Sequence, residues 1–165
     1  MPGDREPPLV SVIINCFNGE RYLRQAMDSI AAQRHPQWEI VFWDNGSIDG
    51  SADIARSYGS QVRYFRATET TPLGAARNLA LQQARGDYVA FLDCDDVWMP
   101  ETLSTLVSAM EGAPWAACYG GIIRMDALGR DLGAWLPVAR QGDLLGPLLT
   151  EFDINVPAVL VRRAA

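Results

Sequence analysis

The sequence of 165 residues contains no lysine, so all 14 of its cationic side chains are arginines and any mechanism that requires a lysine is excluded. Acidic residues number 20, and the formal net charge of −6 argues against nucleic acid as a partner, because such partners need a basic surface. No apolar run approaches the ~20 residues of a membrane-spanning helix, so we expect no transmembrane segment.

Cysteine is also scarce, since only Cys16, Cys94 and Cys118 are present. Their odd number and scattered spacing fit neither a metal site nor a disulfide framework, so we expect free thiols in a reducing compartment. The polar start of the chain and the short apolar run at 9–14 do not form a signal peptide. We therefore expect a cytoplasmic protein. Peripheral attachment to the inner face of the membrane is compatible with this location.

Hydrophobic residues make up 48% of the chain and charged residues 21%, which is typical of one globular domain. Apolar β-branched runs alternate with amphipathic helical patterns through the first two thirds of the sequence. The predicted strands span 9–14, 38–44, 62–65 and 88–93, and the predicted helices 20–33, 50–58, 72–84 and 100–112. Strict alternation predicts an α/β fold with a doubly wound, mostly parallel sheet, which binds ligands at the carboxyl ends of its strands.

The pattern changes after Gly112. We expect a mixed-sheet extension whose parts are a strand at 115–125, a turn at 126–129, a return strand at 132–136, a helix at 141–152 and a final strand at 156–161. The predicted organisation is a flexible leader at 1–8, an α/β core at 9–112 and the beginning of a further region at 113–165.

The run at 88–96 carries the strongest chemical signal, because an apolar strand leads directly into Asp93, Asp95 and Asp96. These carboxylates repel one another unless a cation lies between them, and carboxylate oxygens are suitable ligands for Mn or Mg. The alternative is an ordinary acidic turn at the end of a strand.

Other strands bring polar side chains to the same predicted edge, with Asn15 and Asn18 after the first strand and Asp44 at the end of the second. Asp44 is a candidate ribose or base contact, or else a helix cap or turn residue. Phe17 either stacks on a base or covers the core, and Arg77 either adds a cation to the groove or is solvated on its helix.

We expect His35, beside Pro36, to be an exposed loop residue. The tryptophans are expected mostly in the core, with Trp98 as the exception because it follows the acidic turn.

Five segments resemble the family 2 inverting glycosyltransferases of the GT-A fold, in the order and spacing of that family. Residues 10–18 with Tyr22 and Leu23 resemble the opening of these enzymes, and Trp43-Asp-Asn-Gly-Ser-Ile-Asp-Gly50 resembles their Asp-Asp-Gly-Ser-x-Asp-Gly loop. The other three segments are 74–78, 84–88 and 91–96, and 155–163 resembles a later family segment more weakly.

The resemblance implies a GT-A type, Rossmann-like domain that binds a nucleotide-diphosphate sugar, with a UDP-sugar favoured, for transfer to an acceptor glycan or lipid-linked glycan in polysaccharide synthesis. It implies that Asn15 and Phe17 meet the nucleobase and ribose, that Asp44 contacts the base and that Arg77 lines the same pocket. The remaining implied roles are Asp93 facing the ribose or a metal-bound water, and Asp95 ligating the Mn or Mg that bridges the diphosphate.

The sequence departs from the family pattern in three ways. Asn15 replaces a frequent proline and Asn45 replaces the second aspartate of the loop, which puts nucleotide choice in question. The family's catalytic base belongs to a motif that would follow the 156–163 segment, and none of Asp143, Glu151 and Asp153 matches it. We therefore expect a truncated donor-binding part, whose exposed apolar face could promote a homo-oligomer.

Two other classes fit parts of the pattern. The acidic segment at 91–97 also resembles the haloacid-dehalogenase signature, with Asp93 as nucleophile, but three strand–helix units precede it here and lysine is absent. A module that binds a nucleotide sugar without turnover is the third reading, favoured by the missing base.

Overall fold

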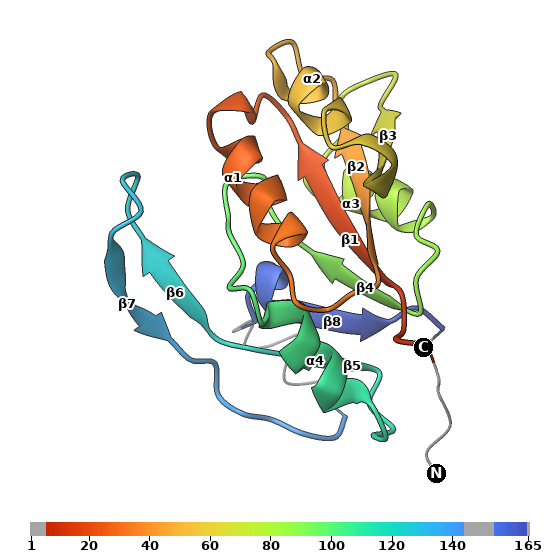
Figure 1. Ribbon diagram of the computed structural model, residues 1–165, viewed down its shortest axis with the longest axis vertical. Coiled ribbons are helices and arrows are strands. Elements are labelled where there is room, and N and C mark those ends of the chain that lie inside the picture. The colour runs from red at the N-terminus through yellow and green to blue at the C-terminus, as the bar shows by residue number, and fades with distance from the viewer. Residues whose placement is uncertain (1–5, 144–153, 165) are drawn as a thin grey trace.

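The structure is a computed structural model that describes residues 6–143 and 154–164. In this part of the chain the main sheet has six strands in the order β3-β2-β1-β4-β8-β5 (Figure 1). Their bounds are β1 Val10–Cys16, β2 Trp38–Asp44, β3 Val62–Arg66, β4 Tyr88–Phe91, β5 Ala117–Tyr119 and β8 Val159–Arg162. The first four run parallel, while β8 lies antiparallel between β4 and β5, so the predicted mostly parallel sheet with a mixed extension is confirmed.

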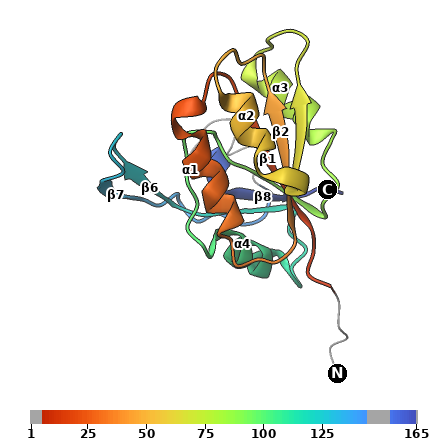
Figure 2. The same ribbon diagram turned by 45° about the horizontal axis from the view of Figure 1, so that its top comes forward.

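Helices cover both faces of this sheet, as Figures 1 and 2 show. The helices are α1 Glu20–Ala31, α2 Ser51–Arg56, α3 Leu73–Leu81 and α4 Thr102–Met110, with 3₁₀ turns η1 at Gly59–Gln61 and η2 at Val156–Ala158. The core cluster on one face is built from α1, α2 and α4, and the smaller cluster on the other from α3 and the 84–89 segment. All seven residues of β1 are buried because helices lie on both sides of it.

The amphipathic pattern of α1 shows why the sequence folds in this way. Leu23, Ala26, Met27 and Ile30 recur at helical spacing and are all 0% exposed against the sheet. On β1 the alternation of side chains sends Ile14 into this cluster and Ile13 into the cluster under α3. The predicted elements of residues 9–112 are all present, although each of the four helices is shorter than expected.

The strand predicted at 115–125 is wrong, because the chain divides there into two strands of different sheets. β5 ends at Tyr119 and joins the main sheet, whereas β6 (Ile122–Met125) pairs with β7 (Asp131–Trp135) in a separate hairpin. A β-carbon on Gly121 would lie 2.5 Å from Leu136 Cδ2 and 2.9 Å from the Trp135 carbonyl oxygen. Glycine therefore permits the close approach at which the chain leaves one sheet for the other.

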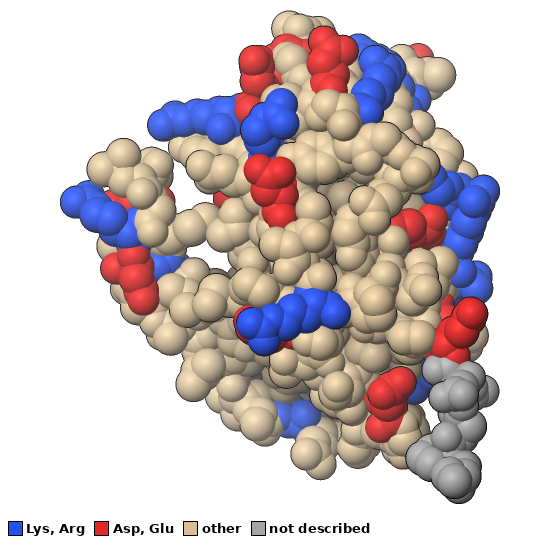
Figure 3. Space-filling model, in the orientation of Figure 1, with Lys and Arg blue, Asp and Glu red and all other residues tan. Residues whose placement is uncertain are grey.

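The hairpin projects from the body, and Figure 3 shows an open gap between the two. Several of its apolar side chains are exposed, including Ile123 at 53%, Leu128 at 78% and Leu132 at 58%. The predicted helix at 141–152 lies mostly outside the described residues.

Two expectations about individual side chains are wrong. His35 is buried, since the chain turns back along the segment entering β1 and the His35 ring donates from Nε2 to the Pro8 carbonyl oxygen at 2.8 Å. Trp98 belongs to the core cluster, and its indole N–H donates to the Pro157 carbonyl oxygen at 2.7 Å. Both contacts join residues far apart in the chain, which local sequence patterns do not report.

Candidate functional site

The polar residues predicted at the sheet edge come together where the strand order reverses. The order runs 3-2-1 on one side of β1 and continues with β4 on the other, so the switch point lies between the carboxyl ends of β1 and β4. Asn15 lies at the end of β1, and Asp93 follows β4 directly. This crevice is the position at which open α/β sheets bind their ligands.

An ion pair crosses this edge from the helix before β4. The Arg77 guanidinium on α3 donates from Nη2 to Asp93 Oδ1 at 2.6 Å, and the two side chains are 22% and 37% exposed. Arg77 therefore faces the edge and is not a solvated helix arginine. The pair places a cation next to the acidic turn while leaving part of both groups open to solvent.

The acidic turn after β4 concentrates negative charge beyond what Arg77 offsets. Asp95 is exposed, whereas burial together with the charges of Asp95 and Asp93 raises the pKa of Asp96 to about 6. Repulsion of this kind favours binding of a cation. Among residues 6–143 and 154–164, no three His, Cys, Asp or Glu side chains form a closed metal centre. Mg-type sites commonly use one or two carboxylates and take their other ligands from substrate phosphates and water, and the turn fits that arrangement.

Asp44 is the most deeply enclosed of the predicted site residues, with 0% exposure. Its carboxylate accepts hydrogen bonds from the backbone N–H groups of Gly46 and Ser47, from the Tyr64 hydroxyl and from Arg66. Burial opposes the charged form, but the hydrogen bonds from Tyr64 and Ser47 and the charge of Arg66 hold the pKa of Asp44 below its ordinary value. A base would reach Asp44 only by displacing one of these donors, so its role as a base contact stays a prediction.

Asn45, which departs from the family pattern, has a clear structural role. Its side chain donates to the Thr71 carbonyl oxygen at 2.8 Å and accepts from the Thr71 backbone N–H at 3.1 Å. An aspartate could accept but could not donate, so the amide allows both bonds that tie the segment before α3 to the end of β2. Sequence reasoning missed this pairing because Thr71 lies 26 residues away.

Two donors at the edge are buried without partners in the described part of the chain. They are the Asn15 amide nitrogen and the Trp43 indole nitrogen, on register-paired residues of β1 and β2. Buried donors are normally satisfied, so these two are free to donate to a ligand or to water. Phe17, in the loop that follows, is 54% exposed and available for stacking. The sequence predicted Asn15 and Phe17 here, but gave no signal for Trp43.

The loops after β1 and β2 hold each other in place. Asn18 adopts a left-handed backbone with φ 54°, its backbone N–H donates to Ser47 Oγ, and its side-chain oxygen accepts from the Ile48 N–H. Asparagine tolerates this conformation better than most residues. The loop that carries Phe17 is thereby fixed against the loop that follows Asp44.

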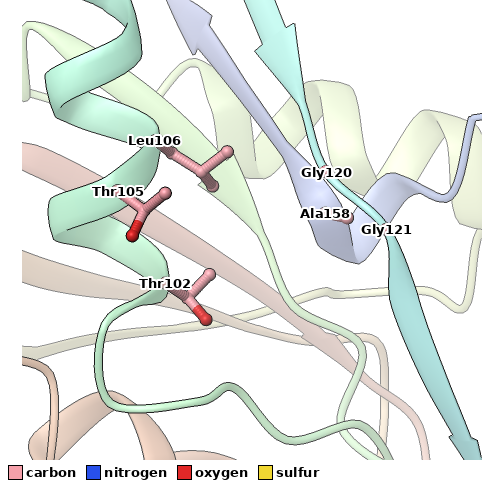
Figure 4. A pocket seen from close by; sticks show the side chains of 6 residues that line it. All are labelled: Thr102, Thr105, Leu106, Gly120, Gly121 and Ala158. Carbon is pink, nitrogen blue, oxygen red and sulfur yellow. The ribbon is translucent and has the colours of Figure 1, made fainter. Parts of the chain in front are cut away.

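A separate hollow of about 220 Å³ lies beside α4 (Figure 4). Its lining comes from α4, the β5–β6 link and η2, and consists of Thr102, Thr105, Leu106, Gly120, Gly121 and Ala158. None of the sequence-predicted site residues lines it. Its surface is mostly apolar, so its chemistry differs from that of the charged edge.

Comparison with known proteins identifies the family to which this chain belongs. The model of the family "Glycosyl transferase family 2" matches residues 11–137, and the chain belongs to this family. It is 34% identical over 132 residues to a putative teichuronic acid biosynthesis glycosyltransferase, TuaG, of Bacillus subtilis, covering 78% of this chain and 52% of the relative.

Solved structures agree with this assignment. The fold resembles S. aureus TarS residues 1–349 in complex with UDP-GlcNAc, with a TM-score of 0.75 and 26% identity over 94% of this chain and 45% of that one. A mannosyltransferase from Pyrobaculum calidifontis, in complex with GDP-Man and Mn²⁺, shares the fold with a TM-score of 0.67 and 23% identity, covering 99% and 48%. The chain thus spans about half the length of these relatives.

These comparisons confirm the family resemblance and the GT-A type fold, and they do not favour the haloacid-dehalogenase alternative. Of the helices in the described part of the chain, none has the length and apolar content needed to cross a bilayer.

Proposed function

We propose that this chain is the donor-binding part of an inverting glycosyltransferase, which holds a UDP-sugar together with Mn²⁺ or Mg²⁺ and serves transfer to an acceptor hydroxyl of a glycan or lipid-linked glycan. The observation that carries this proposal is the meeting of the Arg77–Asp93 pair with the exposed carboxylate of Asp95 at the switch point of the sheet. A nucleotide diphosphate needs cationic partners for its phosphates and hydrogen-bond partners for its base and ribose, and this edge offers both.

Each residue at the edge has a defined part in the proposal. The Asn15 amide, which has no partner among the described residues, donates to the nucleoside, and the exposed ring of Phe17 stacks on the base. Arg77 contributes positive charge to the pocket and holds Asp93 toward the ribose or a metal-bound water. Asp44 acts at the base end, where it also fixes Tyr64 and Arg66.

Asp95 would hold the divalent metal, because its carboxylate is the exposed one of the turn and the neighbouring carboxylates add negative charge. A bound metal supplies charge stabilisation for the diphosphate leaving group. The chain's own residues orient the donor and shield its nucleoside end. No residue of this chain is proposed as the catalytic base.

The complexes of the relatives support the choice of donor. The TarS fragment, at 26% identity, was solved with UDP-GlcNAc, which supports a UDP-sugar here. The Bacillus subtilis relative is named for teichuronic acid biosynthesis, which supports a role in glycan synthesis. A cytoplasmic location and a homo-oligomeric state stay predictions.

Calorimetric titration of the full chain with UDP, with and without Mn²⁺, tests the proposal. Binding should depend on Mn²⁺ and should weaken at least about tenfold in Asp95→Ala, because a carboxylate that ligates the metal is lost. Asp131→Ala removes a carboxylate from the projecting hairpin and should bind as the parent does. UDP affinity that is the same with and without Mn²⁺, or unchanged in Asp95→Ala, would refute the metal site, and tighter binding of GDP or TDP would refute the choice of uridine.

A further inference from the structure

Two thiols from distant parts of the chain meet beside Gly19. Cys16 is the last residue of β1, and Cys94 lies in the acidic turn after β4. A β-carbon on Gly19 would lie 2.7 Å from the Cys16 sulfur and 2.9 Å from the Cys94 sulfur. Both sulfurs therefore border the same small space, which the absence of a side chain at Gly19 leaves open.

Both sulfurs of this pair border Gly19, whereas the third cysteine is not part of the pair. The Cys118 sulfur instead lies 3.4 Å from the Leu106 carbonyl oxygen, on β5 near α4. All three cysteines are free in the structure. Cys16 is 2% exposed, but Cys94 is only partly buried, so a small reagent can reach the pair from the side of the turn.

The position of the pair gives it access to the donor site. Cys94 separates Asp93, which pairs with Arg77, from Asp95, the proposed metal ligand. Cys16 separates Asn15 from Phe17. A bond between the two sulfurs would therefore tie the end of β1 to the acidic turn at the place where the nucleotide is proposed to bind.

We propose that Cys16 and Cys94 are a redox pair whose disulfide reversibly weakens the donor site. Its effect on donor binding rests on the proposed function, but the disulfide itself does not. The structure places both sulfurs beside Gly19 as free thiols, so forming the bond, with sulfurs ~2.05 Å apart, draws the turn toward the end of β1. That movement re-aims Asp95.

The reaction uses a low-molecular-weight disulfide as oxidant. The Cys94 sulfur, which is the partly exposed one of the pair, attacks one sulfur of the reagent as its proton leaves and expels the other as a thiol, which leaves a mixed disulfide on Cys94. The Cys16 sulfur then attacks the Cys94 sulfur and expels the second reagent thiol. The protein loses two electrons and two protons, and the reagent gains both and becomes two thiols.

Peptide mapping of the full chain tests whether the bond forms. Because the sequence has no lysine, trypsin cuts only at arginine, so residues 6–21 carry Cys16 while residues 86–124 carry both Cys94 and Cys118. Cys118→Ser is therefore the variant of choice, and oxidised glutathione is the oxidant. We expect a cross-link between the two peptides, lost with dithiothreitol and absent in Cys16→Ser. Separate glutathione adducts without a cross-link would overturn the proposal, as would a Cys94–Cys118 bond in the parent.

Titration of UDP with Mn²⁺ into the reduced and the oxidised Cys118→Ser protein tests the effect on the site. Oxidation should weaken binding about tenfold, because a displaced ligand side chain loses its productive geometry. Dithiothreitol should restore binding, and Cys94→Ser, which leaves only the buried Cys16 of the pair, should bind equally before and after oxidant. A cross-link that leaves affinity unchanged would overturn the switch and leave the proposed function standing. Failure of the reduced protein to bind UDP would overturn the proposed function and the control of the site, while the mapping would still decide the disulfide.

Discussion

The sheet-and-helix body and the β6–β7 hairpin are both built around β-strands, but they are stabilised in different ways. Every residue of β1 is buried between helices on both faces, whereas most residues of β6 and β7 are exposed. The body also ties its loops with side-chain bonds between distant residues, such as Asp44 with Arg66. The hairpin's comparable contact, between Asp126 and Arg130, joins residues only four apart.

This contrast matters for function, because the candidate site belongs to the sheet-and-helix body, whose strands are buried. Asn15, Asp44 and Asp93 all lie at the ends of buried strands, so their positions are set by the packing of the core. Sites on such elements are held more accurately than sites on isolated loops. The hairpin offers no comparable support, and several of its apolar side chains are exposed to solvent.

The largest expected effect is on stability and compares the two regions directly. Leu23→Ala removes a fully buried side chain of α1 and should lower the free energy of unfolding by about 3 kcal/mol, from lost burial and the cavity left behind. Leu132→Ala, the same change on the hairpin where the side chain is 58% exposed, should cost less than about 0.5 kcal/mol. Urea denaturation measures both, and equal costs would mean that the hairpin is covered in solution.

The second prediction concerns the buried carboxylate at the end of β2. Asp44→Ala should cost about 2 kcal/mol at pH 7, because two backbone N–H groups and the Tyr64 hydroxyl lose their acceptor. Since the pKa of Asp44 is lowered in the folded state, its stabilisation is present above 3.8 and is lost as the pH falls through the folded value. The difference between parent and variant should therefore shrink in strong acid.

Tyr64→Phe is the matched control for this network. It removes one donor to Asp44 and keeps the ring that stacks on Phe42, so it should cost about 1 kcal/mol. A cost as large as that of Asp44→Ala would mean that the Tyr64 bond alone, and not the set of donors, holds the carboxylate.

The smallest of the three principal effects, after those of Leu23→Ala and Asp44→Ala, is expected at the acidic turn. The pKa of Asp96 is raised from 3.8 to about 6, so the folded state binds more protons in that window and stability falls as the pH rises through it. Asp96→Asn removes a partly buried charge and its repulsion by Asp95 and Asp93, and should stabilise the metal-free protein at pH 7 by about 1 kcal/mol, a shift of about two pKa units discounted for solvent exposure. At pH 4 the gain should nearly vanish.

Urea denaturation at the two pH values measures this difference. Asp53→Asn on α2 serves as the control, because its side chain is exposed and lies on another element. A gain for Asp96→Asn that is equal at both pH values would contradict the raised pKa that burial and the neighbouring carboxylates give Asp96.

The fold was predictable where the signal was periodic. The apolar stripe of α1 and the β-branched run of β1 report burial locally, and strict alternation of such elements leaves few topologies. The division of the 115–125 segment into two strands at Gly120 and Gly121 was not predicted, because the residues on both sides have a strand pattern. Only the close approach of Gly121 to Trp135 and Leu136 distinguishes the two strands. Local patterns do not report which sheet a strand joins.

The site was predictable as a set of residues but not as a network. Asp93 and Arg77 were both predicted, and the structure pairs them at 2.6 Å. The side-chain donors to Asp44 come from β3, about 20 residues away, and no spacing rule predicts them. The unpaired indole nitrogen of Trp43 was likewise not predicted, because the sequence pattern of a tryptophan on a strand indicates only a core residue.

The most direct test of the proposed donor site is to locate Mn²⁺ on the protein, isotopically labelled for NMR, in the presence of UDP. Paramagnetic broadening in an amide NMR spectrum falls off steeply with distance from the ion. We predict that the signals of residues 93–96 and 15–18 broaden first, while those of the hairpin at 122–135 remain sharp. Broadening centred on the hairpin, or spread evenly over exposed carboxylates, would contradict a donor site at the switch point of the sheet.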